Sequence, residues 1–212
     1  MKIGIIGTGN MGAAFATSLS KTSHEVFVGS RDPVKGQALA KSLGNLGRNV
    51  KAGSISEAAR FGDVVILAVP WLAVKEVLKA AGNLNGKVVI DISNPLKADY
   101  SGLDVGFSTS AAEEIAKLAP DAKVVKAFNT IFAQVLQSSL HFKEGKANVF
   151  ICGDDSGAKE KVSTIAQDLG YEPIDAGQLS SARFVEPLGM LNIVLGYFQK
   201  MGTNQAFRLL RA

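Results

Sequence analysis

A glycine-rich turn after the first apolar run constrains the fold of this chain more than any other feature. Residues 2–12 read KIGIIGTGNMG, and an apolar helical pattern continues over 13–19. Gly7 allows a tight turn, Gly9 lets phosphates approach the backbone, and Gly12 lets the helix pack on the strand. Because the N–H groups at the start of such a helix face an anion, this strand–turn–helix context predicts a dinucleotide pyrophosphate site.

The end of the second predicted strand indicates which dinucleotide binds. The strand covers 25–29 and runs into Ser30, Arg31 and Asp32. A protein that binds NAD usually carries a carboxylate here for the ribose hydroxyls. A hydroxyl and a guanidinium instead favour the 2′-phosphate of NADP, and Lys35 adds a second positive charge one helical turn later. Asp32 precedes a proline, so we interpret it as a helix N-cap; the alternative for Arg31 is a solvated surface arginine.

Strands and helices alternate along the first 130 residues. The run at 63–69 is continuously apolar, as expected of a parallel strand that is covered on both faces. This order predicts an α/β fold of the Rossmann type, a doubly wound parallel sheet with the ligand across the C-terminal strand ends. The further predicted elements are strands at 49–52, 87–92 and 124–128, and helices at 35–43, after a Ser54–Glu57 capping box, and at 70–81 and 108–119.

A second, shorter series of elements follows. It comprises strands at 147–152 and 171–175, a helix at 156–169 and a long apolar helix at 180–200. The break at 138–146 is the best boundary. We therefore predict a dinucleotide-binding domain at 1–140 and a small C-terminal α/β lobe at 141–212 that ends in the long helix.

Composition narrows the functional classes. The 212 residues are 47% hydrophobic with a net charge of +4, and the basic residues form no run, so nucleic acid is not an expected partner. The single cysteine, Cys152, excludes an intramolecular disulfide and a cysteine-ligated metal cluster, and we expect it to be a small buried hydrophobe. Neither a membrane span nor a signal peptide is recognisable, so we expect a cytoplasmic protein without a membrane partner.

Three predicted strands end in segments that should border the nicotinamide end of the cofactor. These segments are Ala68-Val69-Pro70, Ser93-Asn94-Pro95 and Asn129-Thr130-Ile131. Asn94 could bind the carboxamide or a ribose hydroxyl, and Asn129 could contact a second substrate, although both also suit ordinary turn chemistry. Trp71 could stack on a flat ligand, but a tryptophan at the edge of the core is the more frequent situation.

The sequence shows no acid–base constellation. We expect His24 and His141 to lie at the surface, and Lys97, Asp99 and Glu186 to be solvated charges. A ketone or imine reductase usually needs a proton donor beside the hydride acceptor. We therefore expect no catalytic side chain and no metal, but direct hydride transfer to a ring that needs little proton help, such as a flavin or deazaflavin.

The chain resembles the coenzyme F420-dependent NADP oxidoreductase family, and more distantly the reductase domain of the STEAP metalloreductases. The resemblance runs nearly end to end, and its last motif is the most specific because generic Rossmann proteins lack it. The motifs are IGIIGTGNMG (3–12), HEVFVGSRDPVK (24–35), ILAVPW (66–71), KAFNTI (126–131), CGDD (152–155) and DAGQLSSARFVEPL (175–188).

The resemblance implies a role for several residues. Thr8, Gly9, Asn10 and Met11 would hold the pyrophosphate, and Ser30, Arg31 and Lys35 the 2′-phosphate. Val69, Pro70, Asn94 and Ala133 would line the nicotinamide half. The acceptor ring would lie between Asn129-Thr130-Ile131 and the start of the last helix, near Gly189. Homodimers, typical of the family, would explain the apolar surface of that helix, so the C-terminal lobe is expected to bind the acceptor and form the dimer.

One position departs from part of the family. The archaeal deazaflavin enzymes have His-Thr-Ile where this chain has Asn129-Thr130-Ile131, and the metalloreductases have the asparagine form. F420 is the leading acceptor on resemblance alone, but FMN, FAD or another quinonoid acceptor stays open. The prediction is an NADP(H)-dependent oxidoreductase; the alternatives are a flavin reductase that supports ferric reduction and, outside enzymes, an NADP-binding sensor or scaffold.

Overall fold

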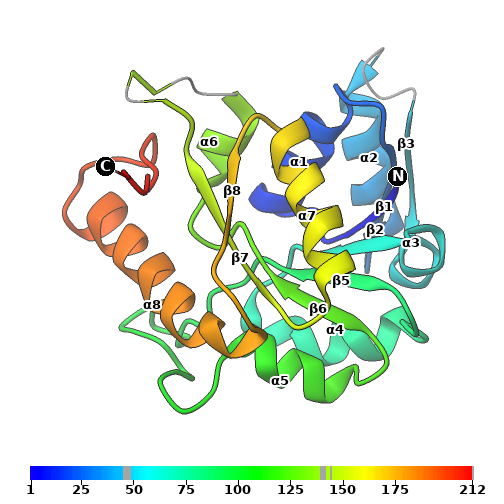
Figure 1. Ribbon diagram of the computed structural model, residues 1–212. Helices are drawn as coiled ribbons and strands as arrows, with labels where there is room; N and C mark the ends of the chain where they lie inside the picture. Colours follow the sequence, from blue (N-terminus) through cyan, green and yellow to red (C-terminus); the bar gives the residue numbers. More distant parts are fainter. Residues whose placement is uncertain (45–48, 139–141, 144, 212) are drawn as a thin grey trace.

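The computed structural model describes residues 1–44, 49–138, 142–143 and 145–211. Within these residues eight strands form one sheet in the order β3-β2-β1-β4-β5-β6-β7-β8 (Figure 1). The first six strands are parallel, β7 runs antiparallel to β6, and β8 is parallel to β7. The strands are β1 Lys2–Ile6, β2 Glu25–Ser30, β3 Val50–Ser54, β4 Val64–Leu67, β5 Val88–Asp91, β6 Lys123–Lys126, β7 Asn148–Gly153 and β8 Glu172–Asp175. The predicted doubly wound fold is confirmed.

Helices cover both faces of this sheet. One apolar cluster joins α1, α6 and α7 to one face, and a second joins α3, α4 and α5 to the other. The helices are α1 Asn10–Leu19, α2 Pro33–Ser42, α3 Ile55–Phe61, α4 Val74–Ala81, α5 Ala111–Leu118, α6 Ala133–Ser138, α7 Ser156–Asp168 and α8 Ala182–Ile193, which a π-helical turn, η4 Val194–Phe198, extends. In the described part of the chain, no helix has both the length and the apolarity to cross a membrane.

The two-sided cover explains why the central strands read as continuous apolar runs. All four residues of β4 are buried, and Ile5 and Ile6 of β1 are fully buried although they point to opposite faces. Cys152 is buried in β7, as expected, and burial raises the pKa of its thiol to about 12. The sheet therefore holds its strand ends in fixed positions.

Local signals set several helix starts. The carboxylate of Asp32 accepts from the backbone N–H of Val34, which confirms it as the N-cap of α2. Ser54 and Glu57 form the predicted capping box at the start of α3. Strand β6 ends earlier than the predicted range 124–128, because Phe128 turns into the left-handed region with φ of 60°.

Strands β7 and β8 extend the same sheet, and the chain then continues into α8. In Figure 1, α8 lies on the left, away from the β3–β2–β1 edge, and the two termini lie on opposite sides of the molecule. The chain then returns to β7, where the backbone N–H of Asn148 donates to Phe207 and its side-chain oxygen accepts from the N–H of Leu209. The boundary predicted at residue 140 lies outside the described residues, as does His141, and the division into two domains stays a prediction.

Candidate functional site

Three adjoining hollows lie along the C-terminal ends of the parallel strands. We call them the Ser30 groove, the Pro70 groove and the Asn129 pocket. The first two share Gly9, Ala68, Val69 and Pro70. The Pro70 groove and the Asn129 pocket share Asn10, Met11, Ile92 and Asn94. The hollows therefore form one continuous path from the end of β2 to the start of α6.

The glycine turn forms the floor where the first two hollows meet. Gly7 has φ of 122°, and a side chain there would overlap the carbonyl of Ala68. A Cβ on Gly12 would overlap the carbonyl of Gly7, so this glycine lets α1 start directly above the turn. Gly9 instead has open space where a Cβ would be. The free space at Gly9 faces the N-terminus of α1, where backbone N–H groups attract anions.

The Ser30 groove has the polar lining that a phosphate needs. Thr8 and Ser30 place their hydroxyl oxygens 3.5 Å apart, and the Ser30 oxygen also accepts from the N–H of Asp32. Arg31 and Lys35 line the same groove and are exposed. The carboxylate of Asp32 is occupied in capping α2. Two hydroxyls and two cations therefore surround the place where a carboxylate would read the ribose of NAD.

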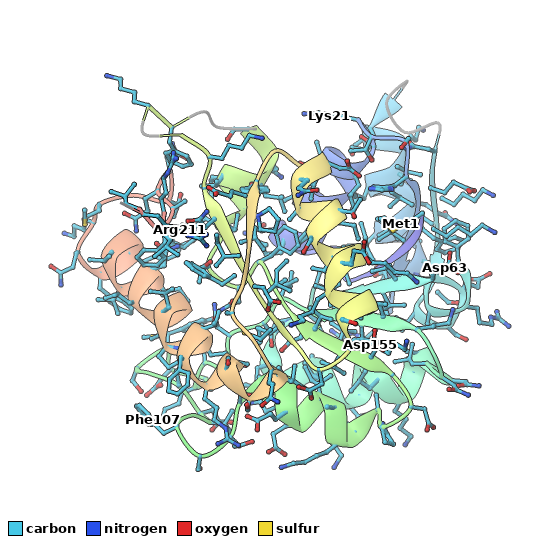
Figure 2. The ribbon with its side chains drawn as sticks, in the orientation of Figure 1. Met1, Lys21, Asp63, Phe107, Asp155 and Arg211 are labelled. Atoms are coloured by element: carbon cyan, nitrogen blue, oxygen red, sulfur yellow. The ribbon has the colours of Figure 1, made fainter. Side chains whose placement is uncertain are left out.

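The Pro70 groove is mostly apolar, with Trp71 at its edge. The indole N–H of Trp71 donates to Asp104 Oδ2 at 3.0 Å, which ties the short turn before α4 to the loop 93–107. The indole is half-buried against the core and also lines the groove, so both sequence interpretations describe part of its position. Phe107, from the same loop, is 85% exposed and lies at the outer edge of the molecule (Figure 2).

An amide pair forms one wall of the Asn129 pocket. Asn94 Nδ2 donates to the Asn129 carbonyl at 2.9 Å, and Asn129 Nδ2 donates to Asn94 Oδ1 at 2.9 Å. Asn129 Nδ2 also donates to the Val185 carbonyl on α8, which fixes the orientation of the amide because a carbonyl only accepts. Asn129 Oδ1 is buried and has no hydrogen-bond partner among the described residues. Gly189 packs so closely against this pair that the two amides leave no room for a side chain on its Cα.

The backbone before this wall is in an uncommon conformation. Phe128 is buried with φ of 60°, which costs a non-glycine residue about 1–2 kcal/mol. Its ring packs edge-on against Phe15 at 5.2 Å and Tyr171 at 6.1 Å, and this packing offsets the cost. The turn at Phe128 directs Asn129 towards Asn94 and α8.

The structure brings together all the residues predicted for the site. The glycine turn, Thr8, Ser30, Arg31 and Lys35 line the Ser30 groove or its floor, and Ala68, Val69 and Pro70 line the two grooves. Ala133, predicted for the nicotinamide half, lines the Asn129 pocket instead of the Pro70 groove. The four residues predicted for the acceptor also line that pocket: Asn129, Thr130, Ile131 and Gly189.

Two side chains expected at the surface are buried. His24 is 3% exposed, and its Nε2 lies 3.0 Å from Asp168 Oδ2. Glu186 is fully buried, because it pairs with Lys126 and accepts from two backbone N–H groups at the start of α5. Sequence reasoning had a signal for this second group, since Asp91 and Lys126 are charges at the ends of apolar strands, but nothing in the sequence paired them. Lys97 and Asp99 are exposed, as expected.

The part of the chain that the structure describes has no cluster of three histidine, cysteine or carboxylate side chains that could hold a metal ion.

Comparison with known proteins shows which family this chain belongs to. Residues 2–95 match the family model "NADP oxidoreductase coenzyme F420-dependent". The chain is 32% identical to the F420-dependent NADP reductase of Methanothermobacter marburgensis, over 92% of this chain and 92% of that protein. The chain belongs to the F420-dependent NADP reductase family.

Two further relatives extend the comparison. The chain is 37% identical to metalloreductase STEAP3 of Rattus norvegicus over 90% of its own length, but it spans only 37% of that protein. Its structure is similar, with a TM-score of 0.89 and 32% identity over the whole of both chains, to the crystal structure of a candidate F420-dependent NADP reductase from Arthrobacter sp. FB24. The Arthrobacter protein therefore shares the fold of this chain over its whole length.

Proposed function

We propose that this protein transfers a hydride directly between the nicotinamide of NADP(H) and a deazaflavin of the F420 type, or a flavin, bound in the Asn129 pocket. The adenosine 2′-phosphate would lie in the Ser30 groove, the pyrophosphate over Gly9, and the nicotinamide in the Pro70 groove. The continuity of the three hollows is the observation that carries the proposal, because it joins a cofactor site to a second, separate ring site.

The residues present suit these groups. Hydroxyls and cations at the Ser30 groove match a phosphate that a carboxylate would repel. The wall shared by the Pro70 groove and the Asn129 pocket contains Met11 and Ile92, which are apolar and suited to flat rings. NADPH supplies the hydride when bound, and the chain's own part is to align the two rings and keep water away from them.

The unpartnered Asn129 oxygen supports a flavin-type acceptor. A buried acceptor without a donor costs about 1–3 kcal/mol. Flavins and deazaflavins carry an N–H group in the ring, whereas a simple quinone carries none. A ring N–H that reached this oxygen on binding would form a hydrogen bond that a quinone could not supply.

The decisive experiment follows the oxidation of NADPH in the presence of F420, FMN or FAD separately. We expect rapid oxidation with one of these acceptors, and much slower oxidation when NADH replaces NADPH. Oxidation of NADH and NADPH at equal rates would contradict the assignment of the Ser30 groove. Tight NADPH binding without oxidation by any of the three acceptors would favour the NADP-binding sensor.

A flavin reductase that supports ferric reduction is the second candidate. The similarity to metalloreductase STEAP3 favours it. Asn129 agrees with it as well, since the resemblance described in the sequence analysis implies an asparagine at this position in the metalloreductases. Rapid NADPH oxidation with FMN or FAD and none with F420, followed by ferric reduction on adding an iron(III) chelate, would select it.

We also propose that the protein acts in the cytoplasm as a homodimer. Helix α8 and its π-helical extension expose large apolar side chains, at Phe184, Leu191, Tyr197 and Phe198. A second copy of the chain would cover them. The molar mass in solution, measured by light scattering, tests this assembly directly.

A further inference from the structure

A buried cluster of three charges lies beneath the Asn129 pocket. Asp91, Lys126 and Glu186 are all fully buried, at the ends of β5 and β6 and in the middle of α8. Lys126 Nζ lies 2.5 Å from Asp91 Oδ2 and 2.8 Å from Glu186 Oε1, and it donates to the Ser93 carbonyl at 2.8 Å. The ammonium therefore lies between two carboxylate oxygens and donates a hydrogen bond to one backbone carbonyl.

The two carboxylates hold further backbone groups. Asp91 Oδ1 accepts from both the N–H and the hydroxyl of Ser93, at 2.8 and 2.7 Å. Glu186 accepts from the N–H groups of Ala111 and Ala112, at 2.9 and 3.2 Å. Burial alone would lower the pKa of Lys126, but the two carboxylates outweigh it and hold that pKa above its ordinary value. Lys126 thus stays charged at neutral pH, and the contacts of the cluster join β5, β6, α5 and α8.

Stability is a poor explanation for such a cluster. Desolvating buried charges costs several kcal/mol per ion, so an apolar trio of similar volume is often as stable or more stable. What a buried ion cluster adds is a defined geometry, because each charge accepts only a narrow range of partner positions. The question is which neighbouring groups depend on that geometry.

Each residue of the ion cluster lies three positions before a residue of the pocket wall. Asn94 follows Asp91 by three residues, Asn129 follows Lys126 by three, and Gly189 follows Glu186 by three, almost one turn of α8. The cluster and the wall therefore join the same three elements at two levels. At the upper level Asn94 and Asn129 bond to each other, and Asn129 bonds to Val185, the residue before Glu186. Ser93, held by both Asp91 and Lys126, directly precedes Asn94.

We infer that Lys126, Asp91 and Glu186 are positioning residues that seat α8 on the ends of β5 and β6 and so set the Asn94–Asn129–Gly189 wall against which the acceptor ring binds; the inference rests on the proposed function. None of the three lines a hollow, so they act through the wall and not by touching a ligand. A shift of about 1 Å in a positioned group can cost on the order of a hundredfold in rate.

The test uses the full chain and a double variant, K126M/D91N. It removes the ionic link between β6 and β5 but keeps the net charge of the cluster, and methionine approximates the shape of the lysine stem. Lys126→Met alone leaves two carboxylates around an apolar side chain, so we expect a much larger loss of stability. The matched control is Lys123→Met, which removes an exposed lysine of the same strand that pairs with Asp155 at 2.8 Å.

We expect K126M/D91N to bind NADPH with a Kd within about threefold of the parent. Its KM for the acceptor should rise at least tenfold, and its kcat should fall by roughly ten- to a hundredfold. Lys123→Met should change none of these values. A folded double variant with unchanged acceptor KM and kcat would overturn the inference.

Hydrogen exchange of the ligand-free proteins separates this outcome from a failure of the proposed function. If the cluster is a positioning unit, exchange in K126M/D91N rises at α8 and around Asn129 and stays unchanged at β1, β2 and α1. This pattern supports the inference even if the parent fails to oxidise NADPH with each of the three acceptors. Unchanged exchange, or a uniform rise that reports only lower global stability, would contradict it.

Discussion

At the scale of single residues, the glycines of the first turn have different structural roles although they belong to one motif. Gly7 and Gly12 are required by the protein itself, because a side chain at either would overlap a backbone carbonyl. Gly9 is not: its φ of −72° suits any residue, and the space beside it is open. The motif therefore combines two glycines that the fold requires with one that the fold does not require.

Replacing Gly9 by alanine should therefore affect binding and not folding. We expect the free energy of unfolding of Gly9→Ala to stay within about 0.5 kcal/mol of the parent, while the Kd for NADPH rises at least tenfold. Gly12→Ala is the contrasting variant and should lose about 1–3 kcal/mol of stability through overpacking. Urea unfolding and NADPH titration measure both quantities. Unchanged NADPH affinity in Gly9→Ala would show that the pyrophosphate does not approach this turn.

Arg31 is the residue on which the choice of coenzyme depends most. Its guanidinium is exposed at the Ser30 groove, so its removal should not disturb the fold. We expect Arg31→Ala to raise the KM for NADPH by roughly ten- to a hundredfold and the KM for NADH less than twofold, because only NADPH carries the 2′-phosphate. Equal effects on both coenzymes would show that Arg31 does not read that phosphate.

At the scale of elements, α8 completes the site that the sheet begins. The parallel strands supply Asn94 and Asn129, but the Asn129 amide is oriented by a carbonyl of α8, and Gly189 lets the helix approach the amide pair. The helix reaches this position after the chain has crossed to β8 and back along the sheet (Figure 1). The Asn129 pocket is therefore a product of helix packing, whereas the Ser30 and Pro70 grooves belong to the strand ends.

Substituting Gly189 tests that packing. A Cβ at this position would lie 2.7 Å from Asn129 Nδ2 and overlap Asn94 Oδ1. We expect Gly189→Ala to lose about 1–3 kcal/mol of stability and to raise the KM for the acceptor more than the KM for NADPH. Gly157→Ala, in the first turn of α7, is the control, because its Cβ meets only an ordinary contact at 3.4 Å. A larger change in the KM for NADPH than for the acceptor would place the ring site elsewhere.

At the scale of the whole molecule, His24 joins an element near the N-terminus of the chain to one in its C-terminal part. It precedes β2, and its ring reaches Asp168 at the end of α7. Burial lowers its pKa from 6.5, the positive amino group of Met1 lowers it further, and Asp168 only partly compensates. The folded protein therefore binds a proton at His24 less readily than the unfolded chain does.

This difference predicts how stability depends on pH. With a folded-state pKa below 6.5, the stability that neutral His24 contributes is fully present above about pH 6.5 and is lost as the pH falls through the folded-state pKa. We expect the free energy of unfolding to decrease from pH 7 to pH 5 in the parent and to decrease less in His24→Gln, whose amide does not titrate. Urea unfolding at several pH values measures it. Identical pH dependence in both proteins would contradict the assignment.

Much of the fold and of the cofactor site could be predicted because it depends on neighbours in the sequence. The glycine turn, the cap at Asp32, the Ser54–Glu57 box and the apolar run of β4 are local patterns, and each forms as predicted. The placement of Ser30 beside Thr8 follows once adjacent parallel strands end at the same edge. Short-range sterics and hydrogen bonding decide all of these features.

Only the tertiary structure decided which distant charges and amides meet. Glu186 and His24 read as surface residues in the sequence, because burial of a charge or an imidazole depends on partners that lie far along the chain. Lys126 meets a carboxylate 35 residues before it and another 60 residues after it, and no local pattern encodes that pairing. Local sequence patterns were enough to predict the doubly wound sheet and the polar groove at the end of β2, whereas long-range packing of α8 sets the shape of the Asn129 pocket, because its contacts join residues far apart in the chain.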